Sequence, residues 1–248
     1  MSNAEVEPRQ GGVFLNAQWR HLVMLNFEID PAVLAARAPA GTEVDRFDGR
    51  AYCSLVGFRF LETRVLGIPI PFHRDFDEIN LRFYVRSKGP RGWRRGVVFV
   101  SEVVPKLAIV AVARAVYGEA YRRHRTRSMI EGPDHQGGRA RFEWRFGGRW
   151  QCVGAAYGPE ARIPGEGSEE EFITEHYWGY AKRRGGGTTE YQVEHPQWPV
   201  RQATKVECEG DWGAFYGPEF VEALSQPPTS AFVAEGSEVA VIRGRRLV

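Results

Sequence analysis

The segment Asp77-Glu-Ile-Asn-Leu-Arg-Phe-Tyr-Val-Arg-Ser87 alternates apolar and polar side chains along nearly its whole length. Successive side chains of a β-strand point to opposite faces, so this alternation predicts an extended strand with two chemically different faces. One face comprises Ile79, Leu81, Phe83 and Val85, and the other comprises Glu78, Asn80, Arg82 and Tyr84.

Turn signals place this strand in a mostly antiparallel sheet. The predicted strand pairs are 77–87 with 94–104, 43–47 with 50–61, and 139–146 with 149–155. Asp48-Gly49 predicts the turn of the second pair, because both residues tolerate the positive φ angles of a two-residue hairpin. Gly147-Gly148 predicts the turn of the third pair in the same way.

Helices are expected to be few and peripheral. Asp30-Pro31 predicts a short helix over 32–37, with Asp30 as N-cap, and Pro39 ends it. Residues 106–117 are interpreted as a buried helix that follows Pro105, with a strand as the alternative because β-branched residues are frequent there. The other predicted elements are a buried strand over 20–29, an apolar loop over 66–72, a helix over 169–181, strands over 188–195 and 198–208, a short helix near 218–225 and two terminal strands.

These elements predict an α+β fold dominated by antiparallel strands. The 248 residues are 43% hydrophobic and show no internal repeat, so one domain is expected over 11–248. Residues 1–10 are interpreted as a disordered N-terminus in which Ser2-Asn3-Ala4 resembles a cloning scar.

Composition excludes several classes of function. A formal net charge of +2 argues against a dedicated nucleic-acid binder, which needs a concentrated basic face. No apolar run approaches the length of a membrane helix, and no secretion signal is evident, so a cytoplasmic protein is expected. Three widely separated cysteines and the absence of a Cys-x-x-Cys pair predict free thiols and no metal site. No cofactor-binding motif is present.

Several segments resemble the uncharacterised DUF2071 family of YqjF-like proteins. They include Trp19-Arg-His-Leu-Val-Met-Leu-Asn26, Tyr52-Cys-Ser-Leu-Val-Gly-Phe58, Pro69-Ile-Pro-Phe-His73, Asn80-Leu-Arg-Phe-Tyr-Val85, Glu102-Val-Val-Pro-Lys106 and Val193-Glu-His-Pro-Gln-Trp-Pro-Val200. The resemblance covers most of the chain, but that family has no established activity to transfer.

A more distant resemblance is to the acetoacetate decarboxylase superfamily, which implies a β-barrel or sandwich with an enclosed, partly apolar cavity. Glu102-Val-Val-Pro105-Lys106 is similar to the segment that carries the Schiff-base lysine of that family. Phe76-Asp77-Glu78 matches the element that carries its glutamate, and Arg20 fits the position of its arginine. Leu107 stands where the family has a second lysine.

The resemblance implies Lys106, Glu78 and Arg20 as catalytic residues of a Schiff-base lyase that acts on a small oxo acid. A Schiff-base lysine must be neutral near pH 7, and burial or a nearby cation favours its neutral form. Substrate contacts are assigned to Phe72, His73, Tyr84 and Glu102.

Three functions remain open for this fold. The first is a decarboxylase-like enzyme, and the second is a non-catalytic module that holds a small molecule, such as a carboxylate, in the same cavity. The third is an oligomerising scaffold without a ligand site. A solvated end-of-strand lysine at 106 and an ordinary cross-strand ion pair at Glu78 are the structural alternatives to catalytic roles.

Overall fold

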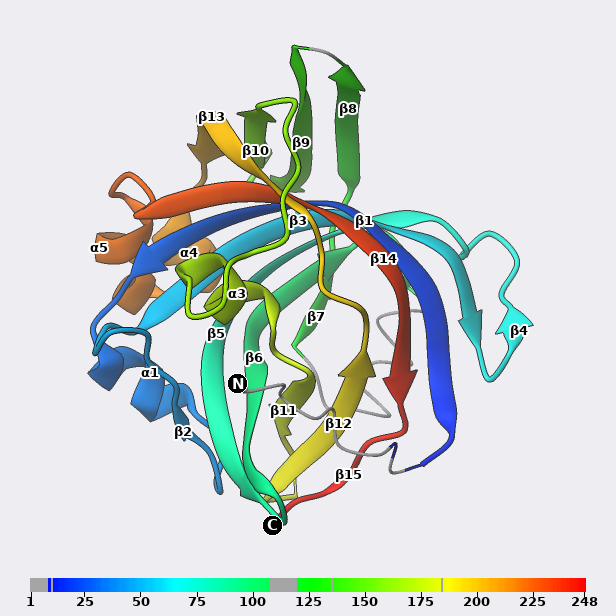
Figure 1. The fold of residues 1–248 in the computed structure, drawn as a ribbon, viewed down its shortest axis with the longest axis vertical. Helices are drawn as coiled ribbons and strands as arrows, with labels where there is room; N and C mark the ends of the chain where they lie inside the picture. The colour runs from blue at the N-terminus through cyan, green and yellow to red at the C-terminus, as the bar shows by residue number, and fades with distance from the viewer. Residues whose placement is uncertain (1–8, 10, 108–119, 135, 184) are drawn as a thin grey trace.

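The computed structural model describes residues 9, 11–107, 120–134, 136–183 and 185–248, and it is dominated by one 15-stranded sheet (Figure 1). The strands are β1 (Val13–Glu28), β2 (Glu43–Val44), β3 (Tyr52–Val65), β4 (Ile68–Pro69), β5 (Phe76–Gly89), β6 (Gly92–Val104), β7 (Tyr121–Arg123), β8 (Thr126–Asp134), β9 (Gly137–Phe146), β10 (Arg149–Tyr157), β11 (Trp178–Lys182), β12 (Thr188–Glu194), β13 (Val200–Glu209), β14 (Ser230–Ile242) and β15 (Arg245–Arg246). The helical elements are α1 (Pro31–Arg37), α3 (Glu169–Thr174), α4 (Trp212–Tyr216), η1 (Pro218–Phe220) and α5 (Val221–Leu224). A mostly antiparallel sheet with few helices confirms the predicted fold class.

Part of the sheet closes on itself. Strands β12, β11, β6, β5, β3, β1 and β14 are hydrogen-bonded in that order. A further pairing of β12 with β14, at Val193 with Val241 and Glu194 with Ala240, completes a ring. The remaining strands β13, β10, β9 and β8 continue from β14 and lie across the outer face of β1, β3 and β5.

The chain therefore has two apolar regions on either side of β1, β3 and β5. Between the ring and the β8–β9–β10–β13 layer, Leu81 and Phe83 pack with Phe142 and Val153 in one core cluster. Inside the ring, Val56 and Phe58 belong to a second cluster. Alternation along each strand sends neighbouring residues to different clusters.

The central prediction, a strand over 77–87 with two different faces, is confirmed. The apolar face of β5 lies in the core between the two layers, and the polar face points into the ring. Glu78 and Asn80 are each 2% exposed and Arg82 is 8% exposed. These side chains thus lie in the interior and away from bulk solvent.

Several local predictions are also confirmed. Asp30 caps α1 by accepting a hydrogen bond from the backbone of Ala32, and β9 and β10 form the hairpin around Gly147-Gly148. Asp48 and Gly49 take positive φ angles of 48° and 79°, as the predicted turn requires. The partner strand was wrong, however, because β2 pairs with β5, and only Phe47 and Arg50 bridge across the turn.

The predicted helix over 169–181 is wrong in its second half. The helix α3 ends at Thr174, and Trp178–Lys182 forms β11. This strand fills the place in the ring between β6 and β12, where it pairs with both. Hydrogen bonding on two sides and burial of Trp178 and Tyr180 outweigh the local helical preference.

Two predictions concern segments outside the described residues: the N-terminal segment over 1–10, of which only residue 9 is described, and the helix over 106–117 beyond its first two residues. The predicted loop over 66–72 contains the short strand β4, which pairs with β3 at an exposed edge. No helix in the described part of the chain is long and apolar enough to cross a bilayer.

Candidate functional site

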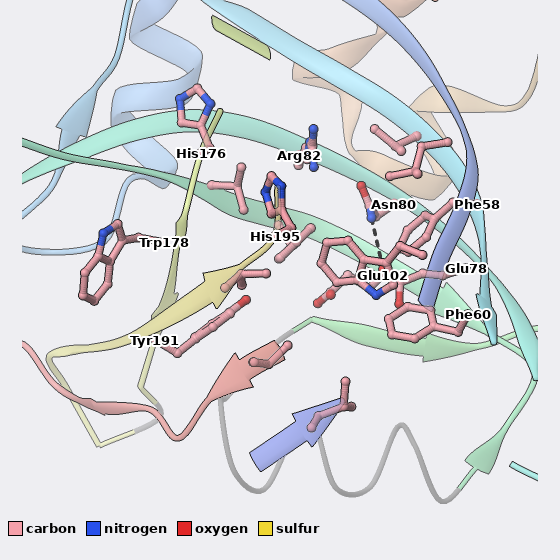
Figure 2. A pocket seen from close by; sticks show the side chains of 18 of the residues that line it. Phe58, Phe60, Glu78, Asn80, Arg82, Glu102, His176, Trp178, Tyr191 and His195 are labelled. Carbon is pink, nitrogen blue, oxygen red and sulfur yellow. Dashed lines mark hydrogen bonds between the residues drawn. The ribbon is translucent and has the colours of Figure 1, made fainter. Parts of the chain in front are cut away.

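A cavity of about 110 Å³ lies inside the ring (Figure 2). Most of its wall is apolar, with contributions from every strand of the ring. The apolar lining comprises Phe14, Leu15, Trp19, Leu22, Val56, Phe58, Phe60, Val65, Phe76, Val97, Phe99, Trp178, Tyr191, Val193, Trp198 and Val241. Engineered apolar cavities of roughly 150 Å³ admit a benzene-sized molecule, so this space suits a small compound.

One wall of the cavity carries a row of polar side chains. Glu78, Asn80 and Arg82 project from the same face of β5, since each is two residues from the next. Glu102 on β6 lies directly opposite Asn80, and Tyr121 on β7 lies beside Glu102. The β5 alternation thus places a carboxyl group, an amide and a guanidinium in sequence along an otherwise apolar interior.

Glu78 is a buried carboxyl group held by two neutral donors. Its Oε1 accepts a hydrogen bond from Asn80 Nδ2 at 3.0 Å, and its Oε2 accepts one from the Tyr121 hydroxyl at 3.0 Å. Burial raises the pKa of Glu78 to about 7, although the two hydrogen bonds and the charge of Arg82 act in the opposite direction. A carboxyl group with this pKa can donate or accept a proton near neutral pH.

The phenol of Tyr121 remains protonated beside this carboxyl group. Burial and the nearby carboxylates of Glu102 and Glu78 raise the pKa of Tyr121 well above its usual value. Tyr121 therefore acts as a hydrogen-bond donor toward Glu78 in the range where Glu78 titrates. The side chain of Glu102 is itself only 2% exposed and lines the same end of the cavity.

Arg82 is a guanidinium enclosed in the protein. Its Nη2 lies 3.3 Å from the backbone oxygen of Ile173 and 3.9 Å from the sulfur of Met24, while its Nε is buried without a partner. None of the described carboxylates forms an ion pair with it. An uncompensated buried charge is costly, about 3–5 kcal/mol when its partner is removed, so the site favours an anion.

His176 lines the end of the cavity beyond Arg82 (Figure 2). Its Nε2 lies 3.7 Å from Oδ2 of Asp45, and Asp45 also accepts a hydrogen bond from Arg95 at 2.8 Å. Burial lowers the pKa of His176 to about 3, so its imidazole is neutral. Burial raises the pKa of Asp45, but the nearby His176 and the hydrogen bond and charge of Arg95 outweigh it and lower the pKa to about 2.

Several polar atoms that are buried at this wall have no hydrogen-bond partner within the described structure. They are Trp19 Nε1, Asn80 Oδ1, Arg82 Nε and both ring nitrogens of His176. Buried polar groups in native proteins are nearly always paired, with protein atoms, water or a ligand. Donors and an acceptor without partners around one apolar space indicate a ligand that has both polar and apolar parts.

The predicted catalytic residues are only partly brought together. Glu78 lines the cavity, whereas Arg20 and Lys106 are not among its described lining residues. Arg20 follows Trp19, which points into the ring, so Arg20 points away and donates hydrogen bonds to Gln18 and to the backbone oxygen of Gly236. Lys106 is half-buried and follows the end of β6.

The predicted substrate contacts are dispersed in the same way. Glu102 lines the cavity. Tyr84 lies behind the wall, where its hydroxyl is 2.6 Å from Ser54 Oγ and its ring packs on His176. Phe72 is 90% exposed, and His73 lies in the same surface loop with Nδ1 2.8 Å from the backbone oxygen of Pro71.

Arg82, Tyr121 and His176 were not selected by sequence reasoning. The alternation that placed Glu78 on the polar face of β5 also placed Arg82 there, so a signal for Arg82 was present. Tyr121 and His176 lie in segments without a comparable pattern, and only the ring brings them to β5. Among the described residues, no group of three or more His, Cys, Asp or Glu side chains is arranged to hold a metal ion.

Solved structures similar to this chain include an acetoacetate decarboxylase and the enduracididine biosynthesis enzyme MppR. The enduracididine biosynthesis enzyme MppR complexed with pyruvate matches with a TM-score of 0.69 and 13% identity, over 100% of this chain and 95% of that one. Acetoacetate decarboxylase from Legionella pneumophila matches with a TM-score of 0.66 and 13% identity, over 99% and 93%. At these identities the likeness establishes the fold.

Sequence comparisons identify the family. YqjF of Bacillus subtilis (strain 168), an uncharacterized protein, is 34% identical over 83 residues, a match that spans about a third of each chain. The family model DUF2071, described as an uncharacterized conserved protein, matches residues 16–238. The predicted resemblance is thereby confirmed: this chain belongs to the DUF2071 family.

Proposed function

We propose that this chain binds a small organic acid in the cavity inside the ring, with the guanidinium of Arg82 holding the carboxylate. The observation that carries the proposal is the buried Arg82 side chain, which lines the cavity and is in ion-pair contact with none of the described carboxylates. A ligand carboxylate would compensate this charge, and the apolar wall would take the remainder of the ligand.

Glu78 supplies the second chemical element of this proposal. With a pKa near 7 and a hydrogen bond from Tyr121, it can exchange a proton with a group bound next to Asn80. The structural neighbour MppR has been crystallised with pyruvate, and another neighbour is acetoacetate decarboxylase. These relationships support a small oxo acid as the ligand class.

In the catalytic form of the proposal, the amine of Lys106 condenses with the ketone of the bound acid and water leaves. The imine nitrogen accepts the electron pair that is released when an adjacent C–C bond breaks with loss of carbon dioxide, or when Glu78 removes a proton from an adjacent carbon. Glu78 then protonates that carbon, and water hydrolyses the imine to release the product and the free amine of Lys106. The alternative is a binding module that holds the same acid without turnover. The position of Lys106 after β6, the strand that carries Glu102 into the cavity, motivates the catalytic form.

Binding is tested by calorimetry with a panel of small 2-oxo and 3-oxo acids. We expect Arg82→Met to weaken binding about 10- to 100-fold, since a buried hydrogen bond to a charge contributes about 1.5–3 kcal/mol. The matched control is Arg20→Met, which is expected to retain binding. If Arg20→Met loses the acid and Arg82→Met keeps it, the assignment to Arg82 is wrong.

The catalytic form is tested by borohydride reduction in the presence of the same acids. An adduct visible in the intact mass, and absent in Lys106→Ala, would support the Schiff base. Acid binding without any adduct would instead favour the binding module.

A further inference from the structure

We infer that His176 is a specificity-determining residue that accepts a hydrogen bond from a hydroxyl group beside the ligand carboxylate, so that the preferred ligand is a 2-hydroxy acid or the enol form of an oxo acid. This inference rests on the proposed binding of an acid at Arg82. It assigns a ligand class to the end of the cavity that lies opposite Glu78.

The first observation is the position of the imidazole. His176 lines the cavity, its side chain is 1% exposed, and neither ring nitrogen has a hydrogen-bond partner in the described structure. The ring packs on Tyr84 and Phe172, with centroids 4.7 and 5.2 Å apart, which fixes its orientation. A fixed, buried imidazole without a partner is a polar group that a ligand can satisfy.

The second observation is the carboxylate behind the ring. Asp45 Oδ2 lies 3.7 Å from Nε2 of His176, and the guanidinium of Arg95, which donates a hydrogen bond to the same oxygen at 2.8 Å, keeps that carboxylate ionised. A neutral imidazole carries one proton, and an adjacent carboxylate favours the tautomer that presents N–H to it. The proton is therefore assigned to Nε2, which leaves Nδ1 as a hydrogen-bond acceptor.

The third observation is the proximity of Arg82. The Arg82 guanidinium lies 5.7 Å from the centroid of the Tyr84 ring, and His176 packs 4.7 Å from the same centroid. Both residues line the same cavity, so Arg82 offers donors and His176 Nδ1 offers an acceptor to one ligand. A carboxylate with a hydroxyl on the adjacent carbon matches this pair, because the carboxylate accepts and the hydroxyl donates.

Three acids with the same branched tail test the inference: 3-methylbutanoate, 2-hydroxy-3-methylbutanoate and 3-methyl-2-oxobutanoate. Calorimetry should show that the hydroxy acid binds about tenfold more tightly than 3-methylbutanoate, because one hydrogen bond typically contributes about that much to affinity. His176→Phe should abolish that preference. His176→Asn, whose amide oxygen can replace Nδ1 as acceptor, should restore part of it.

The outcomes separate this inference from the proposed function. If all three acids bind equally and Arg82→Met weakens each of them, the carboxylate site stands and the role of His176 is overturned. If none of the acids binds, the proposed function fails, and the inference fails with it.

Nitrogen-15 NMR of the ligand-free protein gives a second test that needs no ligand. The His176 ring should show a protonated Nε2 and an unprotonated Nδ1, and Asp45→Asn should shift that tautomer equilibrium. Protonation at Nδ1 in the unmodified protein would overturn the inference, whatever the acids do.

Discussion

At the scale of single residues, the polar side chains inside the ring differ in whether they have a hydrogen-bond or ion-pair partner. Glu78 satisfies its oxygens with neutral donors, and burial favours its protonated form. Arg82, four positions along the same strand, is a buried guanidinium without an ion pair to any described carboxylate and therefore favours an anion.

The raised pKa of Glu78 has a consequence for stability. Its folded pKa of about 7 lies above the unfolded value of 4.5, so the folded protein binds the proton more tightly. This contribution is fully present below pH 4.5 and is lost as pH rises through 7. Glu78→Gln has no carboxyl group at this position, so only the unmodified protein loses this stability as pH rises. Between pH 5 and pH 8 we expect the unfolding free energy of Glu78→Gln to increase, relative to that of the unmodified protein, by on the order of a few kcal/mol.

Urea denaturation at each pH measures this difference. The matched control is Glu219→Gln, because the hydrogen bond from Arg37 lowers the pKa of Glu219, so any pH effect falls below that range. A pH-independent difference between Glu78→Gln and the unmodified protein would contradict the assigned protonation of Glu78.

At the scale of elements, the change from helix α3 to strand β11 determines how the ring is completed. The strand β11 pairs in parallel with β6, with Trp178 opposite Gly96. A Cβ atom at Gly96 would lie 2.6 Å from the backbone oxygen of Trp178 and 2.6 Å from a ring carbon of Tyr180. The close approach of these strands therefore depends on the absence of a side chain at position 96.

We expect Gly96→Ala to destabilise the protein by about 1–3 kcal/mol, the usual cost of overpacking, because the contacted backbone cannot move away freely. Gly158→Ala is the control, since a Cβ atom there meets nothing within 4 Å and should change stability by about 0.5 kcal/mol or less. Thermal and denaturant unfolding of the two variants give the comparison. Equal effects would mean that the β6–β11 contact tolerates a wider spacing.

At the scale of the whole molecule, one buried carboxylate links several strands of the closed sheet. Glu190 on β12 is fully buried and accepts hydrogen bonds from Arg94 on β6, Tyr180 on β11 and Arg245 on β15. The distances from Glu190 to Arg94 and Arg245 are 3.1 and 2.7 Å. This network lies where β12 pairs with β11 on one side and with β15 on the other.

Loss of one partner should expose the cost of burying this charge. Arg94→Met is expected to destabilise the protein by about 3 kcal/mol, because Arg245, which is partly exposed, is then the one cation paired with Glu190 among the described residues. The double variant Arg94→Met with Glu190→Met should recover most of the loss, since an apolar pair carries no desolvation penalty. A double variant no more stable than Arg94→Met alone would argue against an electrostatic origin.

The class of fold and many local elements follow from the amino-acid sequence alone. Alternation in 77–87 specified a two-faced strand, Asp30-Pro31 specified the start of α1, and Gly147-Gly148 specified a hairpin. These features depend on residues close together in the chain, where side-chain periodicity and turn conformations act directly.

Which side of β5 lines the cavity, and which distant residues join it, depends on the tertiary fold. Tyr121 reaches Glu78, and His176, with Asp45 behind it, lines the same cavity, because β7, β11 and β2 pair at particular places in the sheet. Long-range strand pairing and burial also overrode the helical pattern after Thr174. Burial and the hydrogen-bond and ion-pair partners of each group set the pKa values and the charge balance of the site. Both depend on residues that are distant in the sequence, so local spacing does not reveal them.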